Sequence, residues 1–317
     1  MLPVLLPLLL AVSRASAHTG VVLPWDTREF DYANAPPDAW KVLDLHVTVV
    51  VGILAFCWIY RQAMTTWRVR YNWSPVTGET WRQRCFYLGQ LVLMLSLNGP
   101  LHHLSDYYLF CAHMIQHLML TLIWAPLTVL GMPDWLVEKA LTVPRIKRLS
   151  DFFGSLPVKF IAYNGTLFFW HIPYMYDLAI RDHNVHIGEH LMFMSTAVIA
   201  WFGLLCTAPS LPKPHRFAQM LYLFCMTLPM KILGAIITLS STMIYQGYVN
   251  APRIWGITPL MDQRYGGLLM WLPGGLVLWS CMIYVFAQWL KEERAERARD
   301  VLAHVAAMQR EGEGRAT

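Results

Sequence analysis

The chain has 317 residues, of which 56% are hydrophobic and only 14% are charged, and its formal net charge is +5. Soluble domains carry about 25% charged residues, so this composition excludes an ordinary water-exposed globule as well as a disordered chain. The apolar residues fall in several long runs, which predicts an all-α, polytopic membrane protein. The basic excess is typical of loops that orient such a protein, and the sequence contains no motif for binding nucleic acid.

Residues 1–17 form an apolar segment that ends in small residues. Ala15 and Ala17 fit the cleavage pattern of a signal peptide. An uncleaved membrane anchor is the alternative, because the segment has no basic residue before its apolar run. Residues 18–41 are polar and rich in Pro and Asp, and we expect them to form a short periplasmic segment.

Residues 42–290 are predicted to form a bundle of seven transmembrane helices. Groups of helix-breaking residues, such as Asn98-Gly99-Pro100, separate the apolar runs. The predicted spans are Val42–Tyr60, Cys85–Gly99, Tyr107–Leu130, Val158–Ile180, His186–Thr207, Phe217–Ser240 and Gly266–Leu290.

The basic residues are distributed unevenly between the two sides of this predicted bundle. Eighteen Lys and Arg residues fall on one side and five on the other. The side with more basic residues is normally cytoplasmic. This asymmetry predicts a cytoplasmic C-terminus, with residues 291–317 as a charged tail, and a periplasmic mature N-terminus.

Histidines gather in the half of the bundle that is predicted to face the periplasm. His113 and His117 are four residues apart, as are His186 and His190, so each pair projects from one face of its helix. Both pairs lie at a similar depth, about 9 Å below the boundary for a rise of 1.5 Å per residue. Ionisable residues in a membrane usually face the bundle interior, where imidazoles of two helices can converge on one ion.

These four histidines are the predicted metal ligands, and His102, His103 and His171 are candidates for a remaining position. Imidazole suits copper, zinc, iron or nickel, and the methionines nearby favour copper. Hydrogen bonding between helices without any ligand is the simpler alternative.

Four charged residues are predicted to support this site. Asp106 and Glu189 could accept hydrogen bonds from the ligand histidines. Asp262, just before the last span, could close the site from above. Lys231 is a lone cation inside the sixth span that either extends to the outer interface or pairs with a carboxylate, for which Asp106, Asp177 and Asp262 are candidates.

Five segments carry a resemblance to a known family: GPLHHLSD at 99–106, HMIQHLML at 113–120, PLTVLGMPDWL at 126–136, WHIPYMYDLAIRDHNVHIGEHLMFM at 170–194 and DQRYGGLLMW at 262–271. From about Trp40 to Trp289 the chain resembles the seven-helix caa3-type cytochrome oxidase assembly factors, called CtaG. The resemblance implies a bacterial plasma (inner) membrane protein that is needed to make a functional haem–copper oxidase and is suspected of handling copper. Its implied partners are the catalytic subunits of cytochrome c oxidase or other assembly factors.

The leading hypothesis is a non-catalytic membrane assembly factor that binds copper through its histidines. A zinc-dependent intramembrane hydrolase is a second hypothesis, in which three histidines hold zinc and an acid activates water. A haem- or quinone-binding redox protein, with two histidines as axial ligands of a haem, is a third.

Overall fold

The computed structural model describes residues 41–43, 45–71 and 79–316. Within these ranges all secondary structure is helical, which confirms the all-α prediction. The predicted signal segment, residues 1–17, lies outside the described residues, as does all but the last residue of the predicted periplasmic segment 18–41.

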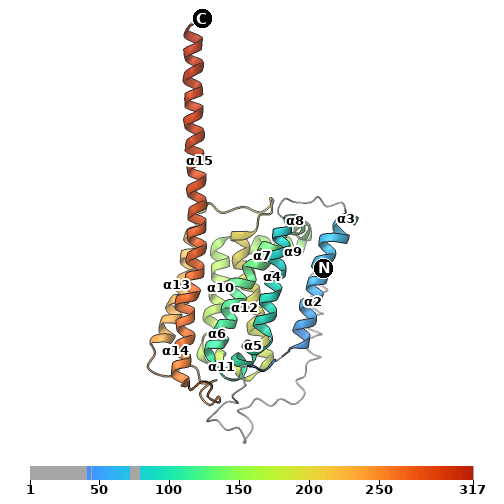
Figure 1. Ribbon diagram of the computed structural model, residues 1–317, viewed down its shortest axis with the longest axis vertical. Coiled ribbons are helices and arrows are strands. Elements are labelled where there is room, and N and C mark those ends of the chain that lie inside the picture. Colours follow the sequence, from blue (N-terminus) through green and yellow to red (C-terminus); the bar gives the residue numbers. More distant parts are fainter. Residues whose placement is uncertain (1–40, 44, 72–78, 317) are drawn as a thin grey trace.

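Five helices of the described chain are long and apolar enough to cross a membrane. They are Val47–Arg70, Phe110–Gly131, His183–Leu205 (α12), Arg216–Leu239 (α13) and Pro259–His304. Three of them include a π-helical segment. The first consists of α2 (Val47–Gln62), η3 (Ala63–Trp67) and α3 (Arg68–Arg70), the second of α6 (Phe110–Leu118), η4 (Met119–Trp124) and α7 (Ala125–Gly131), and the last of α14 (Pro259–Leu269), η5 (Met270–Gly274) and most of α15 (Gly275–Ala316). Two further helices, α4 (Glu79–Leu97) and α10 (Leu156–Trp170), run alongside them in the same bundle (Figure 1).

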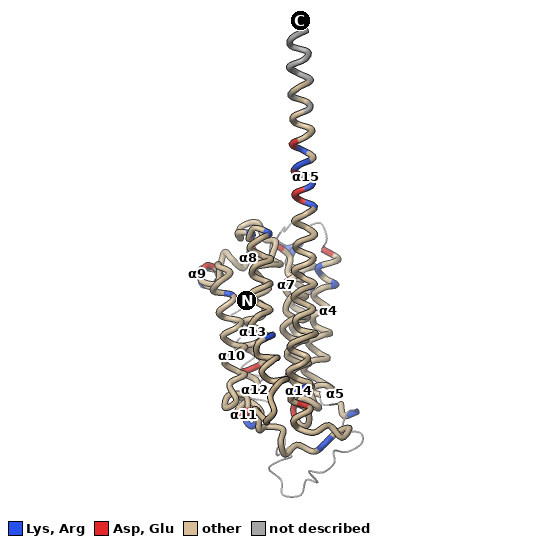
Figure 2. The backbone as a smooth tube through the Cα atoms, turned by 90° about the vertical axis from the view of Figure 1, so that its left-hand side faces the viewer, with Lys and Arg blue, Asp and Glu red and all other residues tan. Residues whose placement is uncertain are grey.

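Short helices cover the two ends of the bundle (Figure 1). One end contains α5 (Pro100–Tyr107) and α11 (Pro173–Arg181), and we call it the α5 end. The other end contains α8 (Asp134–Leu141) and α9 (Pro144–Phe152), and α15 leaves the bundle there. Figure 2 shows that the helices between the two ends carry few charged residues, whereas charges recur on α9 and on the projecting part of α15.

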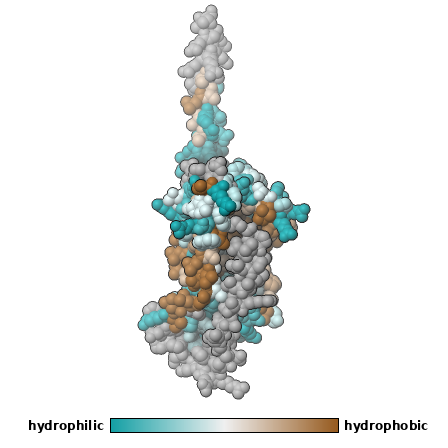
Figure 3. Space-filling model, turned by 90° about the vertical axis from the view of Figure 1, so that its right-hand side faces the viewer, coloured by the Kyte–Doolittle hydropathy of each residue, from teal (hydrophilic) through white to brown (hydrophobic). Residues whose placement is uncertain are grey.

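Apolar side chains cover much of the outer surface of the bundle. Leu54, Ile161 and Ile232, from three different helices, are each more than half exposed. Figure 3 shows hydrophobic residues over the middle of the bundle, beside a hydrophilic end. Large exposed apolar surfaces of this kind mark a membrane interface, which agrees with the prediction of a polytopic membrane protein.

The predicted span Val158–Ile180 is wrong as a single helix, because the chain breaks inside it. Helix α10 ends at Trp170 and α11 begins at Pro173. Proline disfavours a helical conformation in the residue before it, and Ile172 is extended with φ −62° and ψ 125°. The run of apolar residues continues across this break, so hydropathy alone does not reveal it.

The last helix is also longer than predicted. Instead of ending at Leu290, α15 continues without a break to Ala316. The predicted charged tail, residues 291–317, is therefore largely the projecting half of this helix (Figure 1).

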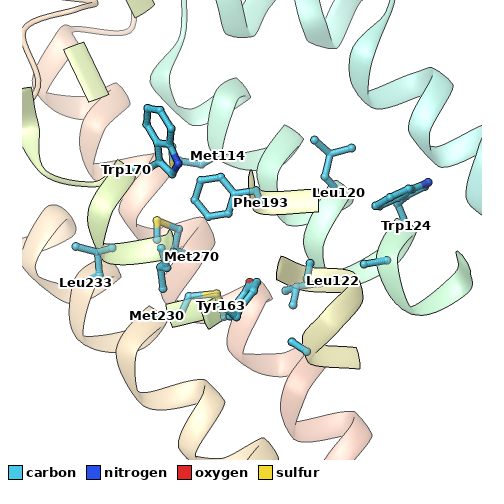
Figure 4. Packing of buried hydrophobic residues seen from close by; sticks show 14 of the residues in the cluster. Met114, Leu120, Leu122, Trp124, Tyr163, Trp170, Phe193, Met230, Leu233 and Met270 are labelled. Carbon is cyan, nitrogen blue, oxygen red and sulfur yellow. The ribbon is translucent and has the colours of Figure 1, made fainter. Parts of the chain in front are cut away.

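The core lies where the central helices meet. Figure 4 shows Met114, Trp170 and Phe193, from three helices, packed in one apolar cluster. Glycines bring α13 and α14 into backbone contact, because a Cβ atom on Gly267 would lie 2.7 Å from the amide nitrogen of Thr238. Small residues permit this close approach between membrane helices.

We expect Gly267→Ala to destabilise the protein by about 1–3 kcal/mol, because the new methyl group overlaps the backbone of α13. Thermal unfolding of the purified protein in detergent measures the effect. Gly165→Ala is the matched control, since this helical glycine has no atom within 4 Å of the added Cβ. Equal melting temperatures for the two variants would contradict the proposed backbone contact.

Candidate metal centre

Helix α12 presents one pair of histidines, and its start is set by a local cap. The Asp182 carboxylate accepts hydrogen bonds from the backbone amides of Asn184 and Val185 at 2.8 and 3.2 Å. Aspartate is a strongly preferred residue at this position because its oxygen satisfies amides that have no partner inside the helix. Because they are four residues apart on this helix, His186 and His190 lie on one face, with their Nε2 atoms 2.8 Å apart.

Helix α6 presents the other pair, and its cap comes from a different helix. Asp262 of α14 accepts hydrogen bonds from the backbone amides of Phe110 at 2.7 Å and Cys111 at 2.9 Å. Asp262 was predicted to close the metal site from above; its carboxylate caps α6 instead. The Nε2 atoms of His113 and His117 on this helix lie 2.6 Å apart.

The two pairs face each other across the contact between α6 and α12. The rings of His113 and His186 stack with centroids 5.3 Å apart and an interplanar angle of 18°. Those of His117 and His190 stack at 5.0 Å and 10°. The structure therefore brings together the four histidines that the sequence singled out, and it does so inside the bundle.

Glu189 completes this group, and its position differs from the prediction. Its Oε1 atom lies 3.7 Å from Nε2 of His113 and 3.5 Å from Nε2 of His117. The carboxylate thus faces the nitrogens that converge, whereas an acceptor that orients a ligand histidine faces the opposite ring nitrogen. One donor atom each from His113, His186 and Glu189 lie within 4.8 Å of one another, as a shared metal ion requires. We call these five residues the buried cluster: His113, His117, His186, Glu189 and His190.

Burial of these five polar side chains costs free energy that apolar side chains in the same place would not cost. None of its residues is more than 8% exposed. The Nδ1 atoms of His113, His117 and His190 and the Oε2 atom of Glu189 have no hydrogen-bond partner in the part of the chain that the structure describes. A buried polar atom without a partner costs about 1–3 kcal/mol. Hydrogen bonding within each helix accounts for the paired Nε2 atoms but leaves these other buried atoms without a partner among the described residues.

A second group of donor atoms lies nearer the surface, at the α5 end. His102 does not join the buried cluster; its Nε2 atom lies 2.6 Å from Nε2 of His46 and 3.4 Å from the Asp106 carboxylate. We call His46, His102 and Asp106 the rim cluster, and their donor atoms also lie within 4.8 Å of one another. The sequence pattern does not single out His46, because this histidine has no second histidine at helical spacing.

The remaining candidate histidines stand apart from both clusters. The ring of His103 contacts that of Tyr107, with centroids 5.0 Å apart. His171 donates from Nδ1 to the carbonyl oxygen of Leu167 at 2.7 Å, and its ring lies 6.3 Å from that of Phe193. Phe193 also contacts His117, so His171 is a neighbour of the buried cluster across this phenyl ring.

Lys231 has a partner other than the predicted carboxylates. Its Nζ atom lies 5.0 Å from the centre of the Trp279 ring, which is a cation–π contact between α13 and α15. Asp262 caps α6, Asp106 belongs to the rim cluster, and Asp177 accepts hydrogen bonds from the backbone amides of Gln246 and Gly247.

A family model described as Cytochrome c oxidase caa3 assembly factor (Caa3_CtaG) matches residues 46–292, a range that includes both clusters. The uncharacterized protein ML1998 of Mycobacterium leprae is 22% identical over 242 residues, which are 70% of this chain and 37% of that protein. The uncharacterized protein Mb0105 of Mycobacterium bovis is 22% identical over 211 residues, 61% of this chain and 32% of that protein. The chain therefore spans only about a third of these relatives. No solved structure matches it.

The cap on α6 generates a prediction. We expect Asp262→Ala to lower the melting temperature, because one buried and one partly buried amide lose their acceptor, at about 1–3 kcal/mol for a buried group left unsatisfied. Asp300→Ala, on the exposed part of α15, is the control for loss of a carboxylate. Thermal unfolding in detergent compares the two, and an Asp262→Ala protein as stable as the control would rule out the capping role.

Proposed function

This chain belongs to the cytochrome c oxidase caa3 assembly factor family, and from that premise we propose that it binds copper in the buried cluster and assists maturation of the oxidase metal centres. The observation that carries this proposal is the convergence of four imidazoles and one carboxylate at a buried contact between two membrane helices. Buried ionisable groups of this kind are functional candidates by default.

The donor set supports copper among the metals that imidazole binds. Divalent copper has the highest affinity of the first-row metals for a given nitrogen and oxygen site. The metal competes with protons for neutral imidazole, so a fall in pH releases it. An ion held in this way can be passed on, and the proposed recipients are the catalytic subunits of the oxidase or other assembly factors. The proposed role is non-catalytic.

A zinc-dependent intramembrane hydrolase is the second candidate, and Glu189 is the observation that favours it. Two histidines and a glutamate hold zinc in several hydrolases, and a further carboxylate or histidine activates the water. Zinc in the purified protein, together with cleavage of a lipid ester or amide, would support this candidate over the copper carrier.

The proposal includes a topology of seven membrane spans in the bacterial inner membrane. Helices α4 and α10 would be the sixth and seventh spans. They run beside the five apolar helices and expose apolar side chains such as Leu91 and Ile161. The end with α8 and α9, where α15 leaves, carries the larger share of basic residues, which favours a cytoplasmic position for the C-terminus. The α5 end and both clusters would then face the periplasmic side.

Metal analysis of the purified chain tests the buried site. We expect the double variant His113→Ala/His190→Ala to lose the copper of this site, because it removes two ligands, whereas loss of a residue that only orients a ligand already weakens binding by about 10–100-fold. His304→Ala is the control, since it removes an exposed imidazole on the projecting part of α15. Copper content that is unchanged in a folded double variant would overturn the ligand assignment.

A further inference from the structure

We propose that the rim cluster, His46, His102 and Asp106, is a second copper site through which the ion reaches the buried cluster. The inference rests on the proposed function, but it concerns different residues and makes a separate prediction about stoichiometry.

The rim cluster has the donor set of a first-row metal site. It combines two imidazole nitrogens with one carboxylate oxygen and includes no sulfur ligand, which suits a divalent ion such as Cu²⁺. His102 and Asp106 are four residues apart on α5, so they share one face of that helix. His46, at the start of α2, approaches the same point from another element of the bundle.

The two clusters differ in access to solvent. The Asp106 side chain is 16% exposed, whereas that of His113 is fully buried and that of Glu189 is 2% exposed. An ion cannot reach the buried cluster from solution without passing some partly exposed group. The rim cluster is such a group.

Two helices, α12 and α6, each carry residues that lie at the rim cluster and residues of the buried cluster. On α12, His183 stacks 6.3 Å from His46, and His186 and His190 follow at intervals of three and four residues on the same face. At 1.5 Å per residue these three rings span about 10 Å of depth. On α6, Gln116 contacts the rim cluster while its neighbour His117 belongs to the buried one.

Gln116 makes the rim site the weaker of the two. Its Nε2 atom donates to the carbonyl oxygen of Ser96 at 2.8 Å and faces Nδ1 of His102 at 3.1 Å. Coordination through Nε2 of His102 requires a proton on Nδ1, so the amide must then turn its oxygen toward this ring and give up the bond to Ser96. This competing bond lowers the affinity for the ion, as a transit site requires.

Copper stoichiometry tests the inference on the purified full chain in detergent, stripped with a chelator and then equilibrated with Cu²⁺. We expect about two ions per wild-type chain and about one in His46→Ala or in the isosteric Asp106→Asn, because each lacks one of the three rim ligands. His103→Ala is the matched control, since it removes the adjacent imidazole on α5 and should retain both ions. The ion that remains in the buried cluster shows that each rim variant is folded.

Loading kinetics test the transit role. With limiting Cu²⁺, His46→Ala should fill the buried site more than about tenfold more slowly than wild type but to the same final level.

Three results would overturn the inference: a wild-type ratio of one, a ratio of two that the rim variants do not lower, or unchanged loading kinetics in His46→Ala. These are distinguishable from failure of the proposed function, in which His113→Ala/His190→Ala retains all of its copper.

Discussion

The contact between two imidazole pairs, deep between α6 and α12, is the constraint on which the structure depends. Each pair is held together by helical spacing alone, but the two pairs meet only if both helices have the right rotation and depth. A shift of one residue along an α-helix turns a side chain by about 100° and moves it by about 1.5 Å. Such a shift would turn the rings away from one another and bury them among apolar side chains.

Both helices are therefore fixed at the ends from which these histidines project. Asp182 caps α12 from within the same chain segment, whereas Asp262 reaches α6 from α14. Glycine makes this second cap geometrically feasible, because a Cβ atom on Gly266 would lie 2.3 Å from the ring of Phe110. The close packing of α14 on α6 thus brings a carboxylate to the helix start and holds His113 at its depth.

The arrangement of polar groups changes with depth. Near the α5 end, His102 and Asp106 are joined to a hydrogen-bond network that includes Gln116 and Ser105. Deeper in the bundle, the carboxylate of Glu189 faces the Nε2 atoms of His113 and His117, and the Nδ1 atoms of these rings have no partner among the described residues. Polar groups near the α5 end are thus hydrogen-bonded to one another, whereas those deeper in the bundle include atoms that the described residues leave unpaired.

The sequence by itself determined the helical class, the membrane environment, the family and the pairing of His113 with His117 and of His186 with His190. These properties are local, because apolar runs and a spacing of four residues have the same meaning in any α-helix. The tertiary structure decided the rest. It placed the helix break before Pro173 and brought His46 into the rim cluster. It also turned the Glu189 carboxylate toward Nε2 of His117 and set the ammonium group of Lys231 over the ring of Trp279. Each of these depends on which helices are neighbours and how each is rotated, and packing between distant segments sets both.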